Sequence, residues 1–283
     1  MSEGRLTSYR RSASAHQPWA GRAGIALALA AVALSRPARA QQPAYAAAQL
    51  ACSRFRERVH STVRTESGGR TLEAITDRRG VWVVRAEAAG SSLALDAWYD
   101  SLAVTRTSAG VSVTPDAGGI LGGRYQGTLA SDGRYVPSVH PFIPDELAEI
   151  VRLDDALDRL FPRLPDRPLR VGESWHEPPA MAIQRMPDSA DGGIPLRRYR
   201  FTASEEGQES AGGDSLPIEL QQRTDERGDV VWHPTIGLLR YARSATVGTM
   251  LPPSRAMPRP MRTTLVQEAV LERVREVDAA DCR

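Results

Sequence analysis

Apolar and polar side chains alternate with a period of two through much of the chain from Phe55 onward. Val81–Val84 is rich in β-branched and aromatic residues, and the segment after it places an apolar stripe on one face, formed by Leu93, Leu95, Ala97 and Tyr99. Glycine and aspartate interrupt these runs at intervals of about 8–12 residues, as the turns of an antiparallel sheet do. The first half of the chain is therefore predicted to be a β-meander.

A helical pattern interrupts the strands between residues 144 and 161. Pro144 is followed by Asp145 and Glu146, and a proline near the first helical position with acids in the first turn is typical of a helix start. Apolar residues then recur at steps of three and four: Leu147, Ile150, Val151, Leu157, Leu160 and Phe161. Pro162 ends the pattern. The sequence therefore predicts a helical insertion near residues 144–161.

Strand patterns resume beyond this insertion. The predicted strands are Ser174–His176, Leu196–Ala203, Pro217–Thr224, Val230–His233 and Leu238–Val247. Segments rich in proline, glycine and serine are predicted as the loops Met186–Pro195, Ser204–Leu216 and Leu251–Met261. Residues 263–277 fit a helical valine stripe as well as a strand, and their threonines and valines favour a strand. Together these patterns predict a β-rich α+β fold built on an antiparallel sheet.

An apolar run near the beginning of the sequence predicts an export signal. Residues 23–34 are apolar, arginines precede them, and the small-residue triplet Ala38-Arg39-Ala40 follows, in the order found in cleavable signal peptides. The run is shorter than the roughly 20 residues that a membrane-spanning helix needs. We therefore expect residues 1–40 to be a signal peptide. Residues 41–283 would then be a single exported domain, periplasmic or secreted, with no transmembrane helix.

The expected mature chain carries a weakly negative formal charge. Removing the six arginines and one glutamate of residues 1–40 leaves 30 basic and 33 acidic side chains, a formal charge of −3. A weakly acidic body gives no reason to expect nucleic acid or an anionic membrane as a partner. Every basic residue is arginine, and these arginines are scattered along the chain. They are expected to line solvated faces.

The two cysteines lie near opposite ends of the mature chain, at Cys52 and Cys282. An oxidising compartment allows a disulfide, and the two termini of a domain are often close in space. The acidic residues around Cys282 are, however, typical of a chain end that frays. The sequence therefore leaves open whether Cys52 and Cys282 pair.

The most specific short segment is Leu164–Trp175, which reads Leu-Pro-Asp-Arg-Pro-Leu-Arg-Val-Gly-Glu-Ser-Trp. It resembles a family of exported bacterial proteins of unknown function that share leucine-proline, two variable residues, proline, an aliphatic residue, two variable residues and Gly-Asp/Glu-Ser-Trp. The likeness extends loosely over residues 55–277 and includes Asp229–Trp232 and Gly237–Leu239. It implies an open antiparallel sheet curled around helices into a half-barrel-like shape, as in periplasmic lipoprotein carriers. The family brings no established catalytic residues.

No reactive constellation stands out in the sequence. Gly172-Glu173-Ser174-Trp175-His176 starts like a nucleophile elbow, but the second glycine is replaced by His176 and no helix follows. The mature histidines occur singly and lack metal-ligand spacing. Trp175 is expected to bury a large apolar surface, with a ligand-lining role for Trp175 and His176 as the weaker alternative. No catalytic residue, metal or cofactor is predicted.

Three functions remain open at this point. The leading hypothesis is a non-catalytic envelope protein that binds an apolar ligand, such as a lipid, or another envelope protein. The second is a hydrolase in which His176 or His233 meets an acid or serine in the folded chain. The third is a structural or assembly scaffold with a filled core. A cavity between the predicted helix and the sheet would favour the first.

Overall fold

The structure, a computed structural model, describes residues 42–178, 180–211, 218–253, 259–274 and 282. All of them belong to one compact unit, Ala40–Arg283. The expected signal peptide, residues 1–40, lies outside the described residues. So do residues 212–216 and 254–258 of two predicted loops, and residues 275–277 of the segment with an ambiguous helix or strand pattern.

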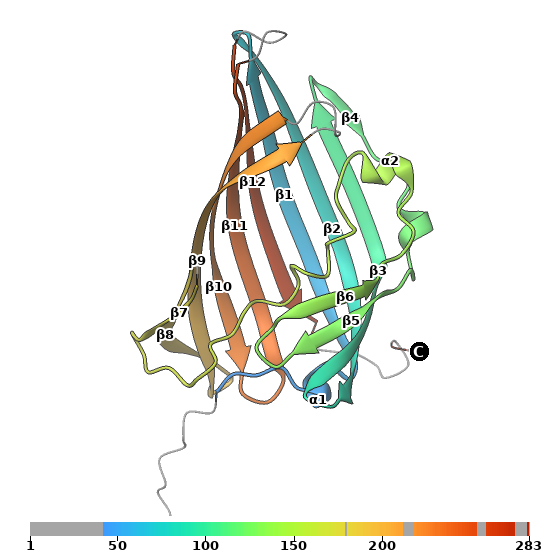
Figure 1. The fold of residues 1–283 in the computed structure, drawn as a ribbon. Helices are drawn as coiled ribbons and strands as arrows, with labels where there is room; N and C mark the ends of the chain where they lie inside the picture. The colour runs from blue at the N-terminus through green and yellow to red at the C-terminus, as the bar shows by residue number, and fades with distance from the viewer. Residues whose placement is uncertain (1–41, 179, 212–217, 254–258, 275–281, 283) are drawn as a thin grey trace, which may run out of the picture. The chain divides into compact units, whose positions relative to one another are not determined.

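Twelve strands form one antiparallel sheet (Figure 1). Their bounds are β1 Ser53–Ser67, β2 Arg70–Ala89, β3 Ser92–Ser108, β4 Val111–Val113, β5 Tyr125–Ala130, β6 Tyr135–Val139, β7 Ser174–Glu177, β8 Met181–Asp191, β9 Ile194–Ala211, β10 Ile218–His233, β11 Gly237–Leu251 and β12 Met261–Arg273. The described helices are single turns: α1 Ala47–Leu50, the 3₁₀ turn η1 Gly118–Ile120 and α2 Asp145–Ala148. The predicted β-rich antiparallel fold is confirmed.

The strand order joins the two ends of the chain in the middle of the sheet. The strands follow one another as β6-β5-β3-β2-β1-β12-β11-β10-β9-β8-β7, with β4 paired only to β3. The first strand, β1, pairs with the last, β12, from Phe55 opposite Arg273 to Glu66 opposite Arg262. The two edge strands, β6 and β7, are consecutive in sequence, and the long connection between them carries α2. This connection is therefore free to cross a face of the sheet.

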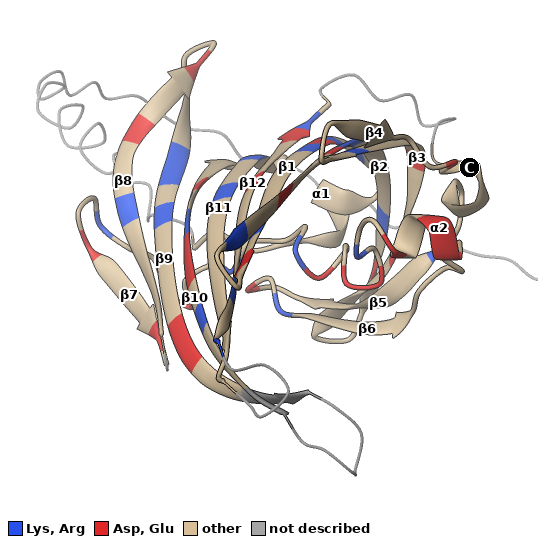
Figure 2. Cartoon of the chain, turned by 90° about the horizontal axis from the view of Figure 1, so that it is seen from above, with Lys and Arg blue, Asp and Glu red and all other residues tan. Residues whose placement is uncertain are grey.

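The sheet curls (Figure 2), and the burial pattern along its strands shows that its two faces differ in polarity. On β1 the inner, concave face carries Phe55, Glu57 and Val59, which are buried, whereas the intervening Arg56 and Arg58 on the outer face are exposed. The main apolar core gathers on the inner face, where Trp82, Tyr99, Phe201 and Trp232 are buried. Alternation along each strand thus separates a core-facing side from a solvated side.

The predicted helical insertion at 144–161 is wrong beyond its first turn. Only Asp145–Ala148 is helical, and the chain continues through short turns in which the amides of Ala156 and Leu160 donate to the carbonyls three residues earlier. Each turn presses apolar side chains onto the sheet, so Leu153, Leu157, Leu160 and Phe161 are all buried. Successive turns of this kind give the same three- and four-residue spacing as a helix.

The predicted loops after β7 are largely strand. Residues 186–191 belong to β8 and residues 204–211 to β9, although both stretches contain proline, glycine or serine. A register shift between Met186 and Ser189 accommodates Pro187, because a proline cannot donate a ladder hydrogen bond. For the ambiguous C-terminal segment, the structure gives strand over Met261–Arg273. β12 pairs with β1 on one side and with β11 on the other, and this pairing favours strand over helix.

Two glycines of the inner face allow aromatic rings to lie flat against the sheet. A Cβ at Gly80 would lie 2.9 Å from Cε1 of Tyr99, and a Cβ at Gly228 would overlap the ring of Phe201 and the carbonyl oxygen of Ala242. The rings occupy the volume that a side chain would take. Both halves of the core are thus built by an aromatic side chain packed over a glycine of the neighbouring strand.

Replacing Gly228 by alanine is expected to destabilise the protein by about 1–3 kcal/mol, because backbone as well as ring must shift to admit the methyl group. Urea unfolding followed by tryptophan fluorescence measures the change. Gly207→Ala is the matched control, since Gly207 also lies in a strand but no atom comes within 4 Å of its added Cβ. Equal stability losses in the two variants would contradict the packing argument.

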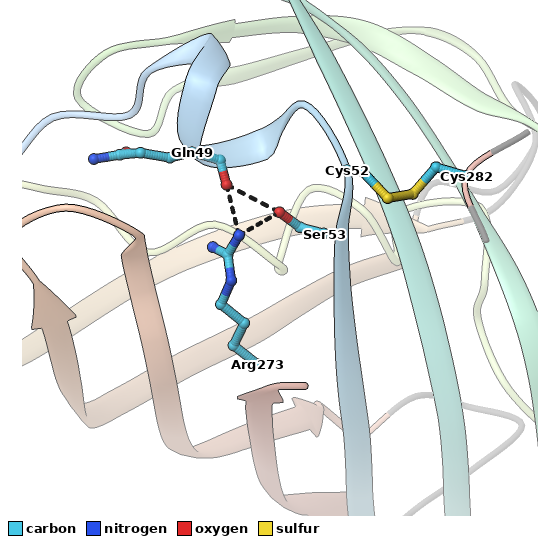
Figure 3. The surroundings of a disulfide bond; sticks show 5 residues. All are labelled: Gln49, Cys52, Ser53, Arg273 and Cys282. Atoms are coloured by element: carbon cyan, nitrogen blue, oxygen red, sulfur yellow. Dashed lines mark hydrogen bonds between the residues drawn. A yellow bond between two sulfur atoms is a disulfide. The ribbon is translucent and has the colours of Figure 1, made fainter. Parts of the chain in front are cut away.

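A disulfide between Cys52 and Cys282 fastens the C-terminal end of the chain to the start of β1 (Figure 3). The two Cα atoms are 5.8 Å apart. The bridge packs in a small apolar cluster with Val83 and Trp98 on the outer face of the sheet. The bridge thus closes a loop of 230 residues. The sequence leaves open whether these two cysteines pair, and the structure pairs them.

The same end of the sheet is held by Arg273 on β12. Its Nη2 donates to the carbonyl oxygen of Gln49 at 2.7 Å and to the hydroxyl of Ser53 at 2.6 Å (Figure 3). The Ser53 hydroxyl in turn donates to the same carbonyl at 2.9 Å. These contacts fix the entry of the chain into β1 against the last strand.

Candidate functional site

A cavity of about 450 Å³ lies between the inner face of the sheet and the connection from β6 to β7. Its floor comes from β1, β2, β10, β11 and β12, and its roof from residues 150–160. The lining includes Val59, Val63, Arg78, Ile150, Val151, Leu160, Tyr241, Arg243, Val247, Leu265, Gln267 and Leu271. The volume falls within the range of small-molecule sites, about 300–1,000 Å³.

Hydrogen bonds from β3 and β5 anchor the start of the roof. The hydroxyl of Tyr125 donates to the carbonyl oxygen of Leu153 at 2.9 Å. The Nη1 atom of Arg106 donates to the carbonyl oxygen of Glu149 at 3.2 Å. Both acceptors are backbone carbonyls that a continuous helix would use internally, so these contacts favour the irregular path of the roof.

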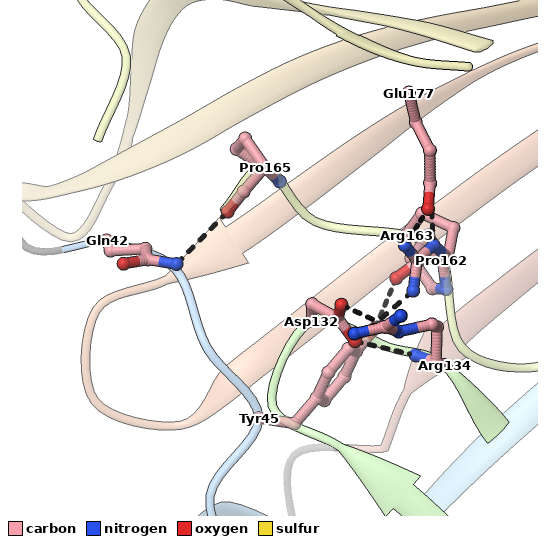
Figure 4. Close-up of polar contacts among 8 residues, drawn as sticks. All are labelled: Gln42, Tyr45, Asp132, Arg134, Pro162, Arg163, Pro165 and Glu177. Atoms are coloured by element: carbon pink, nitrogen blue, oxygen red, sulfur yellow. Dashed lines mark hydrogen bonds and ion pairs between the residues drawn. The ribbon is translucent and has the colours of Figure 1, made fainter. Parts of the chain in front are cut away.

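The far end of the roof is tied to the loop between β5 and β6 and to β7 (Figure 4). Arg163 forms ion pairs with Asp132 and with Glu177, and its Nε lies 2.9 Å from the Glu177 carboxylate. The hydroxyl of Tyr45 donates to the carbonyl oxygen of Pro162 at 3.1 Å. The segment that covers the cavity is therefore held at both ends by polar contacts.

Polar side chains cross the middle of the cavity floor. Arg243 Nη2 donates to Gln267 Oε1 at 2.8 Å, and Gln267 Nε2 donates to the hydroxyl of Ser61 at 3.1 Å. Arg243 also pairs with Glu226 at 3.4 Å. One row further along the strands, the floor becomes apolar at Val63, Leu265 and Val247, which are register neighbours across β1, β12 and β11. The floor therefore has a polar middle and an apolar end.

A buried ion pair borders the cavity on the β1–β2 side. Arg78 Nη2 donates to Glu57 Oε1 at 2.8 Å, and the side chains are only 11% and 9% exposed. The other carboxylate oxygen accepts from the hydroxyl of Tyr99 at 3.0 Å and from Trp82 Nε1 at 3.4 Å. Burial alone lowers the pKa of Arg78, but Glu57, together with Tyr99 and Tyr125, more than offsets this and leaves the pKa above its ordinary value.

A second hollow of about 400 Å³ adjoins the first and shares Arg159, Tyr241 and Arg243 with it. It reaches toward Phe161, Met181 and Phe201 on the β8–β9 side. Burial raises the pKa of Asp158 at its edge, and the neighbouring Asp155 adds to this rise. Together the linings of the two hollows extend along the inner face from β1 to β8.

Trp175 and His176, the residues that the sequence singled out as weak ligand-lining candidates, lie on the edge strand β7. Trp175 is half-buried and packs against the main core, whereas His176 is exposed. Neither residue is among those that line the two hollows. Their role in ligand binding remains a prediction.

His233, a residue of the hydrolase hypothesis, caps a turn. Its Nδ1 accepts hydrogen bonds from the amides of Thr235 and Ile236 at 3.0 and 3.2 Å. In the described part of the chain, neither His233 nor His176 is hydrogen-bonded to a carboxylate, and no cluster of histidine, cysteine, aspartate and glutamate could hold a metal ion. The geometry that the hydrolase hypothesis requires is not found among these residues.

The described residues form only short helices. None of their helices has both the length and the apolar character needed to cross a bilayer.

Comparison with known proteins identifies no family for this chain. No family model and no curated protein matches the chain. A DUF1329 family protein from Desulfovibrio piger aligns with 81% of this chain and 89% of its own, at 9% identity and a TM-score of 0.16. A structure from Vibrio parahaemolyticus named an outer membrane lipoprotein-sorting protein domain aligns over the same shares, at 8% identity and a TM-score of 0.17. TM-scores this low carry no argument, so the family resemblance of residues 164–175 remains a prediction.

Proposed function

We propose that this protein is a non-catalytic, exported binding protein that holds an elongated amphiphile, such as a lipid, on the inner face of its curled sheet. The observation that carries the proposal is the cavity of about 450 Å³ under the segment 150–160. A scaffold with a filled core has no need of such a space. The cavity persists although close packing is the rule in protein interiors.

The lining supports an amphiphile rather than a pure hydrocarbon. Val63, Val247 and Leu265 offer an apolar surface at one end of the floor. Beside them, Gln267 and Arg243 present amide and guanidinium groups to the same space. Binding sites of this kind combine apolar walls with a few fixed polar groups that orient the ligand.

Native mass spectrometry of the protein, purified from the periplasm of an expressing bacterium without detergent, tests the proposal. We expect a bound species of lipid mass that is released by organic solvent. A protein that carries no lipid and also fails to bind the fluorescent amphiphile 1-N-phenylnaphthylamine would refute the proposal.

Filling the cavity should weaken binding without unfolding the sheet. Ala269 lies on the floor, opposite Val59 on β1 and Arg243 on β11. Ala269→Phe places a ring in the ligand space, and we expect the affinity for 1-N-phenylnaphthylamine to fall about tenfold or more, which corresponds to about 1.4 kcal/mol. Fluorescence titration measures the loss.

Val266→Phe on the same strand is the matched control, because Val266 is 40% exposed and belongs to the outer face. It should bind the probe like the unmodified protein. Far-ultraviolet circular dichroism checks that both variants keep the sheet. Equal probe binding by Ala269→Phe and Val266→Phe would place the ligand outside this cavity.

A further inference from the structure

Charged residues that face each other across the strands have opposite signs almost throughout the outer face. These register partners are Arg56–Glu272, Arg64–Glu73, Glu66–Arg262, Arg85–Asp96, Arg200–Asp229, Glu206–Arg223 and Arg240–Glu272. Several form close ion pairs, such as Arg200–Asp229 at 3.3 Å and Arg223–Glu206 at 3.1 Å. Opposite charges in these positions stabilise a sheet, and like charges destabilise it.

One pair among the described residues breaks this rule. Arg58 on β1 lies directly opposite Arg79 on β2, and both side chains are exposed on the outer face. Arg56 precedes Arg58 on the same face of β1. In the described part of the chain, none of these three arginines has an ion pair, since every pair found there involves other residues.

The neighbouring carboxylates are already engaged. Asp77 bonds His60 at 2.9 Å, and Glu272 pairs with Arg240 at 3.4 Å. Asp100, at the bulge of β3, pairs with Arg54. The positive charge of the three arginines is therefore not balanced by the protein groups nearest to them in the register.

The three arginines surround a hollow. Arg56, Arg58 and Arg79 line a depression of about 590 Å³ on the outer face, together with Val81, Ser101 and Ala103. Ser101 and Ala103 on β3 are small, so the space beside the arginines stays open. Ser101 also contributes a hydroxyl group to the lining.

We propose that this outer hollow binds a phosphate group, either free or as part of a phospholipid head group. Planar guanidinium groups bind phosphate through two parallel hydrogen bonds, and a cluster of them adds charge complementarity. The bound anion replaces the missing acid between Arg58 and Arg79 and removes their repulsion. This site is on the face opposite the lipid cavity and does not depend on it.

Thermal unfolding of the full chain tests the site with inorganic phosphate as the probe. At equal ionic strength, we expect the melting temperature to be about 2–4 °C higher in phosphate than in chloride. Arg58→Gln and Arg79→Gln should each lose this shift. In chloride, each variant should melt at or above the temperature of the unmodified protein, because the like-charge contact is gone.

Arg200→Gln is the matched control, since it removes an exposed arginine from the same face but leaves the hollow intact. It should keep the phosphate shift. Flotation with vesicles of phosphatidylglycerol and phosphatidylcholine then identifies the source of the phosphate. Binding that Arg79→Gln abolishes identifies a lipid head group, and a phosphate shift without vesicle binding identifies a soluble anion. The absence of both effects, or their persistence in Arg79→Gln, overturns the proposal.

Discussion

Glu57→Ala is expected to lower the free energy of unfolding by about 3–5 kcal/mol, because it leaves the charge of Arg78 buried without its carboxylate. Glu57 is the charged partner of Arg78 in the described structure, and the buried Nε of Arg78 has no hydrogen-bond partner there. The same substitution also removes the acceptor of the Tyr99 hydroxyl and of the Trp82 indole. Urea unfolding at neutral pH measures the loss.

Two further variants test this explanation. Replacing both partners, Glu57→Leu with Arg78→Met, should recover the part of the loss that comes from the unpaired charge, since apolar side chains of similar volume need no charge compensation. Asp229→Ala breaks an exposed pair with Arg200 and should cost no more than about 1 kcal/mol. A double variant as unstable as Glu57→Ala would show that the charge is not the cause.

Removing the disulfide is expected to destabilise the protein by up to about 5 kcal/mol, since the bridge closes a loop of 230 residues and restricts the unfolded chain. For a domain of this size, such a loss lowers the melting temperature by about 10–20 °C. Cys52→Ala combined with Cys282→Ala, followed by differential scanning calorimetry, measures the effect.

Reduction provides the control for this prediction. Dithiothreitol should bring the melting temperature of the unmodified protein close to that of the double alanine variant and should leave the variant unchanged. If reduction and the double substitution change the melting temperature by less than 2 °C, the bridge does not constrain the unfolded chain.

The strands could be predicted where apolar and polar residues alternate strongly. The path of residues 150–161 over the cavity could not be predicted. The period-two pattern from Phe55 to Tyr99 gives β1, β2 and β3, since one face of each strand is buried. Residues 150–161 fail as a helix because their apolar spacing reflects contacts with the sheet. Nothing local in the sequence distinguishes a helix face from successive turns that lie on a common surface.

The candidate site left a weaker trace in the sequence. Glu57 and Arg78 each occupy a position on the apolar face of an alternating strand. Glu57 shares its face of β1 with Phe55 and Val59, and Arg78 shares its face of β2 with Trp82. A charge at such a position predicts a buried partner or a lined cavity. The partner lies 21 residues away, and the pairing of β12 with β1 joins segments about 200 residues apart. Neither relation can be deduced from local patterns.

The union of β1 with β12 also sets the order in which the protein can fold. β1 is synthesised before β12, so the pairing of these two strands in the middle of the sheet cannot form until β12 has been made. Contacts between such distant residues slow folding and leave unpaired strand edges exposed in the meantime. Each half of the meander therefore offers an open edge to other chains during that interval, and a chaperone that masks β1 or β12 would protect the chain at its most vulnerable stage.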